Sequence, residues 1–152
     1  MNQFLQTIKE KFFFWNKSKE VAFSFKLEPS ALFGQIYSPT IDILLWSRRG
    51  EDWIKTPIVI DTGADYTILP EFLALQLGID LQKDCERLLT IGVGGKTPVY
   101  FYPRLRVRVA NFERIIPVGF LKAEIPALMG RQAFFETFET SFIRNKRIYF
   151  RE

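Results

Sequence analysis

The chain has 152 residues, of which 47% are apolar and 25% are charged, so it is long enough for one globular domain with a substantial core. It contains no histidine and a single cysteine, Cys85, which excludes Ser-His-Asp and Cys-His catalysis, internal disulfides and most zinc sites. The net charge of +4 is a mild excess that does not by itself indicate a nucleic-acid partner. A hydrolase of this composition must take its chemistry from Asp, Glu, Ser, Thr, Lys or Tyr, and although carboxylates can bind Mg²⁺, we predict neither a metal nor another cofactor.

The first 20 residues place apolar side chains at helical spacing, with lysines around the apolar stripe. We expect residues 1–30 to be an N-terminal extension, whose apolar spacing favours a helix, and we expect it to dock on the domain or on a partner subunit. A basic amphipathic helix in contact with an anionic membrane surface, through residues 1–20, is the alternative. No run is long enough to span a membrane, and charged residues interrupt any signal-peptide core, so with one cysteine the sequence favours a cytoplasmic location.

From residue 35 the pattern is typical of β-strands. We expect a strand over residues 35–46 with a break at Pro39, a turn over 48–52 and a second strand over 53–60. A short helix is predicted over 71–78, with Pro70 in its first turn and Gly78 at its end. A strand over residues 85–91 follows this helix.

A glycine-rich tip over residues 92–95 connects that strand to a long strand over 97–110, in which three arginines alternate with apolar residues. Such alternation is typical of a half-buried strand, so we expect the arginines to face solvent, and a site for an acidic partner is the alternative. A turn at 111–114 leads to a returning strand that ends at residue 120. A second short helix is expected to begin near Arg131, and a hairpin around Asn145-Lys146 ends the domain, which is mostly β over residues 31–152.

The segment Ile91–Pro98 contains Gly-Lys-Thr, as phosphate-binding loops do. Thr90 stands where such a loop needs its first glycine, and a strand pattern follows where the loop needs a helix. The segment is better interpreted as a hairpin tip whose glycines let the backbone approach a ligand closely.

The sequence Asp61-Thr62-Gly63 directly follows the apolar run Ile58–Ile60, at the expected end of a buried strand. Three residues alone are modest evidence. A glycine-rich hairpin tip follows about 30 residues later, and Leu128-Met129-Gly130 then precedes an expected helix. In this order the three motifs resemble those of the retropepsin family, the retroviral-type aspartic proteases, and especially of its single-domain prokaryotic relatives, over residues 35–150.

The resemblance implies a small, closed β-barrel-like fold that is functional as a homodimer and hydrolyses polypeptides as an aspartic endopeptidase. It implies that Asp61 is catalytic, that Gly63 lets two active-site loops approach each other, and that Thr62 hydrogen-bonds to the partner's loop. It also implies a hairpin lid, or flap. The residues implied in substrate binding are Ala64, Asp65, Val93, Gly94 and Gly95, and those that support the loop are Leu128, Met129, Gly130 and Arg131, the last paired with Asp65. Gln132 departs from the Asp or Asn that the family often has.

Peptide hydrolysis without a metal or a covalent nucleophile can be performed by two facing carboxylates that share one proton. The chain has a single Asp-Thr-Gly and no Asp-Ser-Gly, so the second carboxylate must come from a second copy, and the sequence predicts a symmetric homodimer. A non-catalytic dimerisation or peptide-binding module with the same fold is the alternative. A nucleic-acid-binding domain is not expected, since Phe101 and Tyr102 are the only aromatic candidates near the arginines.

Overall fold

The computed structural model describes residues 19–92, 94–144 and 146–152. The apolar stripe predicted as a helix, residues 4–15, lies outside the described residues, as does the membrane contact considered for it. Among the residues that are described, no helix is both long and apolar enough to cross a membrane.

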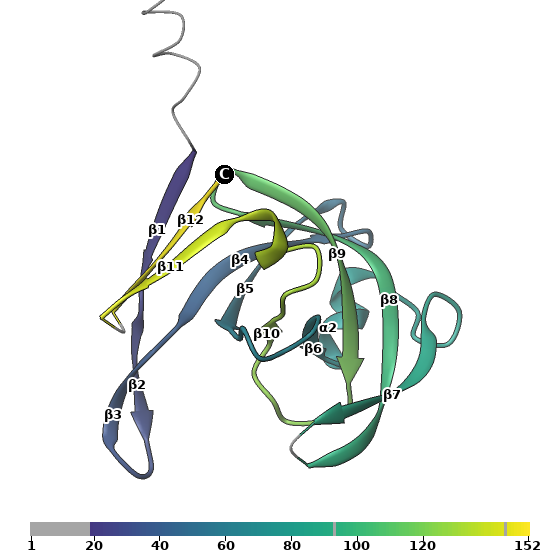
Figure 1. Ribbon diagram of the computed structural model, residues 1–152. Coiled ribbons are helices and arrows are strands. Elements are labelled where there is room, and N and C mark those ends of the chain that lie inside the picture. Colours follow the sequence, from purple (N-terminus) through teal and green to yellow (C-terminus); the bar gives the residue numbers. More distant parts are fainter. Residues whose placement is uncertain (1–18, 93, 145) are drawn as a thin grey trace, which may run out of the picture.

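The described part of the chain is mostly β-structure with one short α-helix (Figure 1). The elements are β1 (Glu20–Ser24), β2 (Lys26–Ser30), β3 (Gly34–Ser38), β4 (Thr40–Ser47), β5 (Asp52–Ile60), β6 (Thr67–Pro70), α2 (Phe72–Leu77), β7 (Glu86–Gly92), β8 (Gly95–Val109), β9 (Phe112–Leu121), β10 (Leu128–Met129), the 3₁₀-helix η1 (Phe135–Thr137), β11 (Glu139–Ile143) and β12 (Arg147–Arg151).

Seven strands form the main sheet, in the order β4-β5-β10-β6-β9-β8-β7. The two-residue strand β10 lies between β5 and β6, parallel to the first and antiparallel to the second. The sheet curls so far that β4 also pairs with β8, at Leu44↔Arg108 and Leu45↔Val107. A second sheet has the order β1-β12-β11, while β2 and β3 pair with each other as a separate hairpin.

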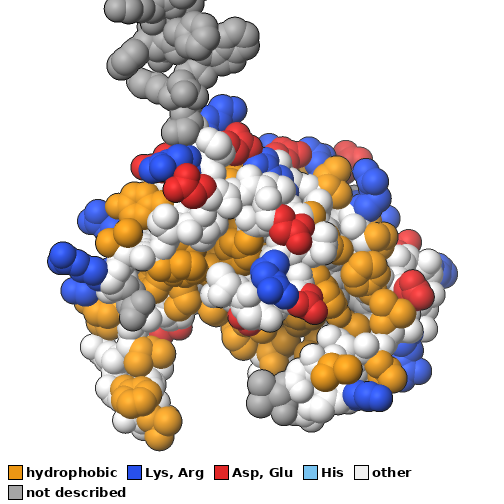
Figure 2. Space-filling model, in the orientation of Figure 1, with side chains coloured by type: hydrophobic (Ala, Val, Ile, Leu, Met, Phe, Trp, Pro, Cys, Tyr) orange, Lys and Arg blue, Asp and Glu red, His pale blue; other side chains and the backbone are white. Residues whose placement is uncertain are grey.

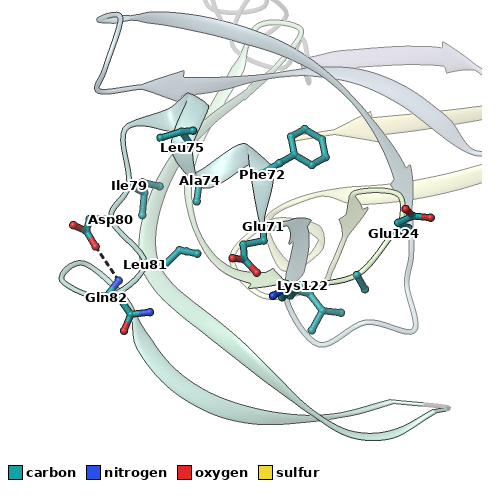
Figure 3. Close-up of a pocket in the computed structure, with 12 residues that line it drawn as sticks. Glu71, Phe72, Ala74, Leu75, Ile79, Asp80, Leu81, Gln82, Lys122 and Glu124 are labelled. Atoms are coloured by element: carbon teal, nitrogen blue, oxygen red, sulfur yellow. Dashed lines mark hydrogen bonds between the residues drawn. The ribbon is translucent and has the colours of Figure 1, made fainter.

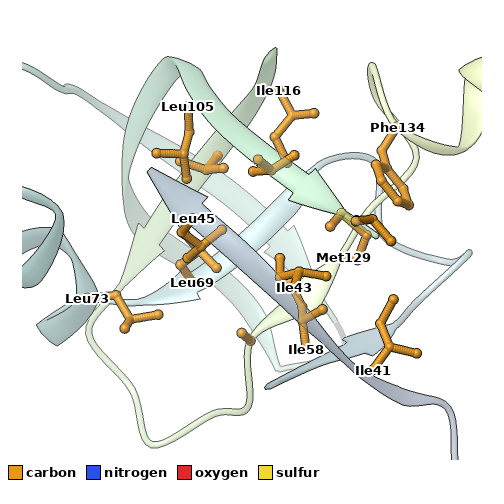
Figure 4. Close-up of a cluster of buried hydrophobic side chains, with 14 of the residues drawn as sticks. Ile41, Ile43, Leu45, Ile58, Leu69, Leu73, Leu105, Ile116, Met129 and Phe134 are labelled. Atoms are coloured by element: carbon orange, nitrogen blue, oxygen red, sulfur yellow. The ribbon is translucent and has the colours of Figure 1, made fainter. Parts of the chain in front are cut away.

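The core lies inside the curled main sheet, where alternate residues of each strand point inward (Figure 4). On β8 the inward residues are Leu105, Val107 and Val109, all buried, and they alternate with the three arginines as the sequence predicts. Helix α2 adds Leu73 and Leu77 to the same core.

The predicted strands between residues 35 and 121 are confirmed, and α2 ends at Gly78 with a left-handed φ of 72°. The turn predicted over residues 111–114 is shorter than expected, because β8 ends at Val109 and β9 already begins at Phe112. The position of Pro70 was predicted wrongly, because it ends β6, where it is paired with Leu121, and does not begin the helix. The second predicted helix is only the 3₁₀-turn η1. Ala133, at a φ of 58°, adopts a left-handed conformation that an α-helix starting at Arg131 cannot continue through.

Residues 20–30, predicted as part of an extension, are β-strands in the structure. β1 pairs with β12 from Glu20↔Arg151 to Ser24↔Arg147, and Val21 and Phe23 pack against the core. β2 pairs with β3. The expected boundary at residue 30 therefore falls inside the β2–β3 hairpin.

Candidate active site

The loop that carries Asp61 connects the end of β5 to the start of β6. The Asp61 amide donates a hydrogen bond to the Met129 carbonyl (3.0 Å), which continues the pairing of β5 with β10 by one residue. Two further amides turn the loop back on itself: that of Gly63 donates to Asp61 Oδ1 (2.9 Å) and that of Ala64 to the Asp61 carbonyl (3.3 Å). The Asp61 carboxylate is thus oriented by backbone on its own loop, and its side chain is half-buried.

The end of β10 packs against this loop. At Gly130, which directly follows β10, a side chain would clash with the backbone, because a Cβ would lie 2.2 Å from the carbonyl carbon of Tyr66. Thr67 is fully buried beside it, where its hydroxyl donates to Met129 Sδ (3.2 Å) and accepts a hydrogen bond from the Gly130 amide (3.2 Å). The segment after β10 and the loop before β6 therefore fix each other's position.

An ion pair connects the loop to the segment after β10. The Arg131 guanidinium bonds to the Asp65 carboxylate, the pairing that the family resemblance implies. The backbones run together here as well, since the Arg131 amide donates to the Ala64 carbonyl (3.0 Å) and the Gln132 amide to the Asp65 carbonyl (2.8 Å). Gln132 thus holds the loop through its main chain, which any residue at this position except proline would also provide.

A shallow pocket of about 520 Å³ lies next to this ion pair. Its lining residues are Asp65, Arg131, Gln132, Phe135 and Glu136. A broader, open pocket of about 860 Å³ lies between α2 and residues 121–124, and Asp61 is not among the residues that line it (Figure 3). Of the residues of the Asp61 loop, Asp65 therefore lines the first pocket and none lines the second.

The glycine-rich hairpin is formed by β7 and β8, with Gly92 paired with Gly95 at its end. Gly95 has a φ of +99°, which favours glycine, and a Cβ built on Gly94 would meet nothing within 4 Å. Val93, predicted to bind substrate, lies outside the described residues. The hairpin and the Asp61 loop face the same side of the molecule (Figure 1), and the Tyr66 and Phe101 rings, 5.8 Å apart, connect the loop to β8.

The alternating arginines of β8 do not simply face water. Arg106 and Arg108 both bind the Glu113 carboxylate, and these two arginines hold the pKa of that carboxyl below its usual range. The Arg108 guanidinium also lies 4.2 Å from the ring of Trp53. These partners come from β9 and β5, which the spacing of the arginines within β8 does not reveal.

Among solved structures the chain is similar to a retropepsin-like aspartic protease from Rickettsia conorii, with a TM-score of 0.60 over 89% of this chain and 95% of that protein. The two chains share this fold. Their sequence identity is only 16%, no family model matches the sequence, and no curated protein matches it. The retropepsin-like fold is thus shown by structure, whereas the chemistry has to be argued from the site.

Three residues beside Asp61 were not predicted from the sequence as part of the site. Thr67 and Tyr66 were not singled out at all, and Pro39 was predicted only as a break in a strand. Pro39 lies beside the site because its carbonyl accepts a hydrogen bond from the Ile60 amide (2.9 Å), one residue before Asp61. The available signal for Thr67 was a hydroxyl at an inward position of a strand, since buried hydroxyl groups need partners.

Proposed function

We propose that this protein is an aspartic endopeptidase in which two copies of Asp61, one from each subunit of a homodimer, activate water for the hydrolysis of peptide bonds. The observation that carries the proposal is the construction around Asp61. The carboxylate stands at the end of a strand, on a loop held by β10, by the Thr67 hydroxyl and by the ion pair of Arg131 with Asp65. Rigid support of this kind is what a catalytic group needs and a surface aspartate does not.

In the proposed reaction one carboxylate accepts a proton from water while its mate donates a proton to the carbonyl oxygen of the substrate. The attack of water then gives a tetrahedral intermediate, whose collapse expels the amine as it takes up a proton. Two carboxylates at close range hold one proton between them, because ionising both is costly, and this shared proton supplies the acid. No metal is needed for these steps.

The homodimer follows from the same chemistry. A chain with one Asp-Thr-Gly supplies one carboxylate, and a two-fold axis that passes beside Asp61 supplies the second. Gly63 suits the approach of the two loops, since its main chain is exposed and it has no side chain to occupy the axis. Thr62, which is also exposed, is proposed to hydrogen-bond to the partner's loop.

The proposed lid is the β7–β8 hairpin, with Gly94 and Gly95 against the substrate backbone. A lid must open to admit a polypeptide and close to exclude water. Its connection to the Asp61 loop through Tyr66 and Phe101 supports this role. Ala64 and Asp65 are proposed to line the same cleft.

The experiment that tests the proposal is cleavage of a denatured protein mixture at mildly acidic pH by wild type and by Asp61→Asn. The amide cannot take a proton from water, so we expect a rate at least about a hundredfold lower, without loss of the folded state. Asp52→Asn is the matched control, because it makes the same change at the opposite end of β5, where the Trp53 amide (2.7 Å) is the one hydrogen-bond partner of the carboxylate among the described residues.

Near-wild-type turnover of Asp61→Asn would refute the assignment. Wild-type protein that dimerises and binds peptides without cleaving them would support the alternative of a peptide-binding module with the same fold.

A further inference from the structure

The hairpin of β2 and β3, residues 26–38, projects from the molecule as an arm (Figure 1). Among the described strands β2 and β3 pair only with each other, so both long edges of the arm have unpaired backbone groups. A lone two-stranded hairpin is marginally stable in water. The arm therefore needs support beyond its own hydrogen bonds.

The tip of the arm is apolar and largely exposed. Leu32 and Phe33 are 85% and 76% exposed, and Leu27 and Tyr37 add apolar surface along one face. No charged residue occurs between positions 29 and 37. An apolar, uncharged projection of this kind has the composition of an interface core rather than of a solvated loop.

The root of the arm contacts the end of β5, directly before the Asp61 loop. Pro39, which connects β3 to β4, accepts the hydrogen bond from the Ile60 amide (2.9 Å), and the Ser38 and Thr40 hydroxyls bond to each other (2.7 Å). Thr40 is paired with Val59 on β5. The root of the arm is thus bonded to Ile60, the residue directly before Asp61. The strands of the arm are five residues long, so its tip lies about 16 Å from this root.

The arm points to the side of the molecule that the Asp61 loop faces. In Figure 1 the arm and the β7–β8 hairpin both extend past the loop between β5 and β6, and Figure 2 shows the surface hollowed between these two projections. If a two-fold axis runs beside Asp61, the second copy occupies this side. An arm rooted next to the axis then has to run along that second copy.

We infer that the arm is a dimer clasp: its apolar tip and face pack against the second copy of this chain and hold the two Asp61 loops together. This inference rests on the proposed function, which supplies the axis, and it adds the surface that forms the dimer. The active site is then incomplete without the arm of each subunit, because the second carboxylate arrives only with a docked partner.

The test is the dimer dissociation constant, measured by sedimentation velocity over a dilution series for wild type and for Leu32→Ser/Phe33→Ser. We expect the double variant to dimerise at least about tenfold more weakly, because the tip lies in the interface. The matched control is Phe72→Ser/Leu75→Ser on α2, where the two side chains are 63% and 69% exposed. Helix α2 follows the end of β6, whereas the Asp61 loop precedes its start. We expect the control to change the constant less than about twofold.

Hydrogen exchange of the wild-type protein tests the clasp without any substitution. At concentrations above the dissociation constant, the amides of residues 26–38 should exchange at least about tenfold more slowly than below it. The same exchange rates at both concentrations would overturn the clasp.

The outcomes separate the clasp from the proposed function. A wild-type dimer that the arm variant forms equally well refutes the clasp alone. An arm variant with a raised KM and an unchanged dimer also refutes it, by assigning the arm to the substrate. An active wild-type monomer refutes the paired carboxylates, and the clasp with them.

Discussion

At the scale of single residues, the position of Asp61 depends on close contacts between its loop and the residues around β10. Gly130 and Thr67 pack so closely against the Asp61 loop that the position of the carboxylate is set by the position of β10. Tyr66 takes part on both sides, since its backbone lies against Gly130 and its ring lies against Phe101 of β8 and would contact any Cβ on Gly119. We therefore expect a small change in this layer to be transmitted to the Asp61 carboxylate.

The first prediction concerns Gly130. We expect Gly130→Ala to lower the free energy of unfolding by about 2–3 kcal/mol, because its Cβ would meet the Tyr66 backbone at 2.2 Å and neither segment can move freely. Denaturation by urea measures this change. The control is Gly92→Ala, where a Cβ meets nothing within 4 Å and the change should stay within about 0.5 kcal/mol. Equal stabilities of both variants would mean that the loop is not packed as described.

At the scale of elements, the sequence allowed a prediction of the strands whose side chains alternate between core and solvent. β5, β8 and β9 were predictable in this way, and so was the end of α2 at Gly78, because the backbone chemistry is local. Pro70, η1 and β10 were not. β10 is two residues long and exists only because β5 and β6 flank it, and no local pattern encodes a strand that short.

The site was predictable to the same degree. Asp61, Thr62 and Gly63 stand together in the sequence and are recognisable as a motif, and the pairing of Arg131 with Asp65 follows from a family likeness. The contacts of Pro39 and Thr67 join residues far apart in the chain, so they depend on the tertiary arrangement. The arm was not predicted for another reason: its sequence has no clear strand alternation, since Leu32-Phe33 and Ile36-Tyr37 are consecutive, and only the structure shows that Leu32 and Phe33 are exposed among the described residues.

The second prediction concerns the β7–β8 hairpin. We expect Gly94→Val to lower turnover at least about fivefold, since a lid that closes on a substrate backbone has no room for a branched side chain. Its thermal midpoint should stay near that of wild type, because a Cβ at this tip meets nothing. Gly50→Val, at the turn between β4 and β5, is the matched control and should leave both quantities unchanged. Unchanged kinetics in Gly94→Val would make the hairpin an ordinary surface feature.

The third prediction concerns the anchor of the arm. Hydrogen bonds from Lys26, the larger effect, and from Lys55 lower the pKa of the Asp42 carboxyl. The bond from Lys26 connects β2 to β4, whereas Lys55 is on β5. Because the pKa is lower in the folded state, the stabilisation is present above the unfolded value of about 3.9 and is lost as the pH falls through the folded value. Asp42→Asn should therefore be less stable than wild type at pH 6, by no more than about 1 kcal/mol because the groups are partly exposed.

The measurement is urea denaturation of wild type and Asp42→Asn from pH 6 down to pH 3. The difference in unfolding free energy should shrink below about pH 4, and 1 M salt should reduce it at pH 6. A difference that is independent of both pH and salt would show that the ion pairs do not anchor the arm.

At the scale of the whole molecule, the features on the Asp61 side belong together. A half-site carrying one carboxylate, a glycine-tipped hairpin and an apolar arm all face the same side, where Figure 2 shows a hollow. A single chain leaves this side open, and a second copy related by a two-fold axis would cover the arm while it completes the pair of carboxylates. The proposed function and the clasp both require that each active site takes one Asp61 from each of two chains.

Mixing wild type with Asp61→Asn tests that claim most directly. At a fixed total concentration well above the dissociation constant, random pairing of equal amounts leaves about one quarter of the dimers with two Asp61 residues. If the site is paired, we expect a cleavage rate of about one quarter of that of wild type at the same total concentration. When Asp52→Asn is mixed in instead, we expect the rate to be unchanged. A rate of about one half would mean that each chain cleaves with its own Asp61 alone, which would contradict the paired site.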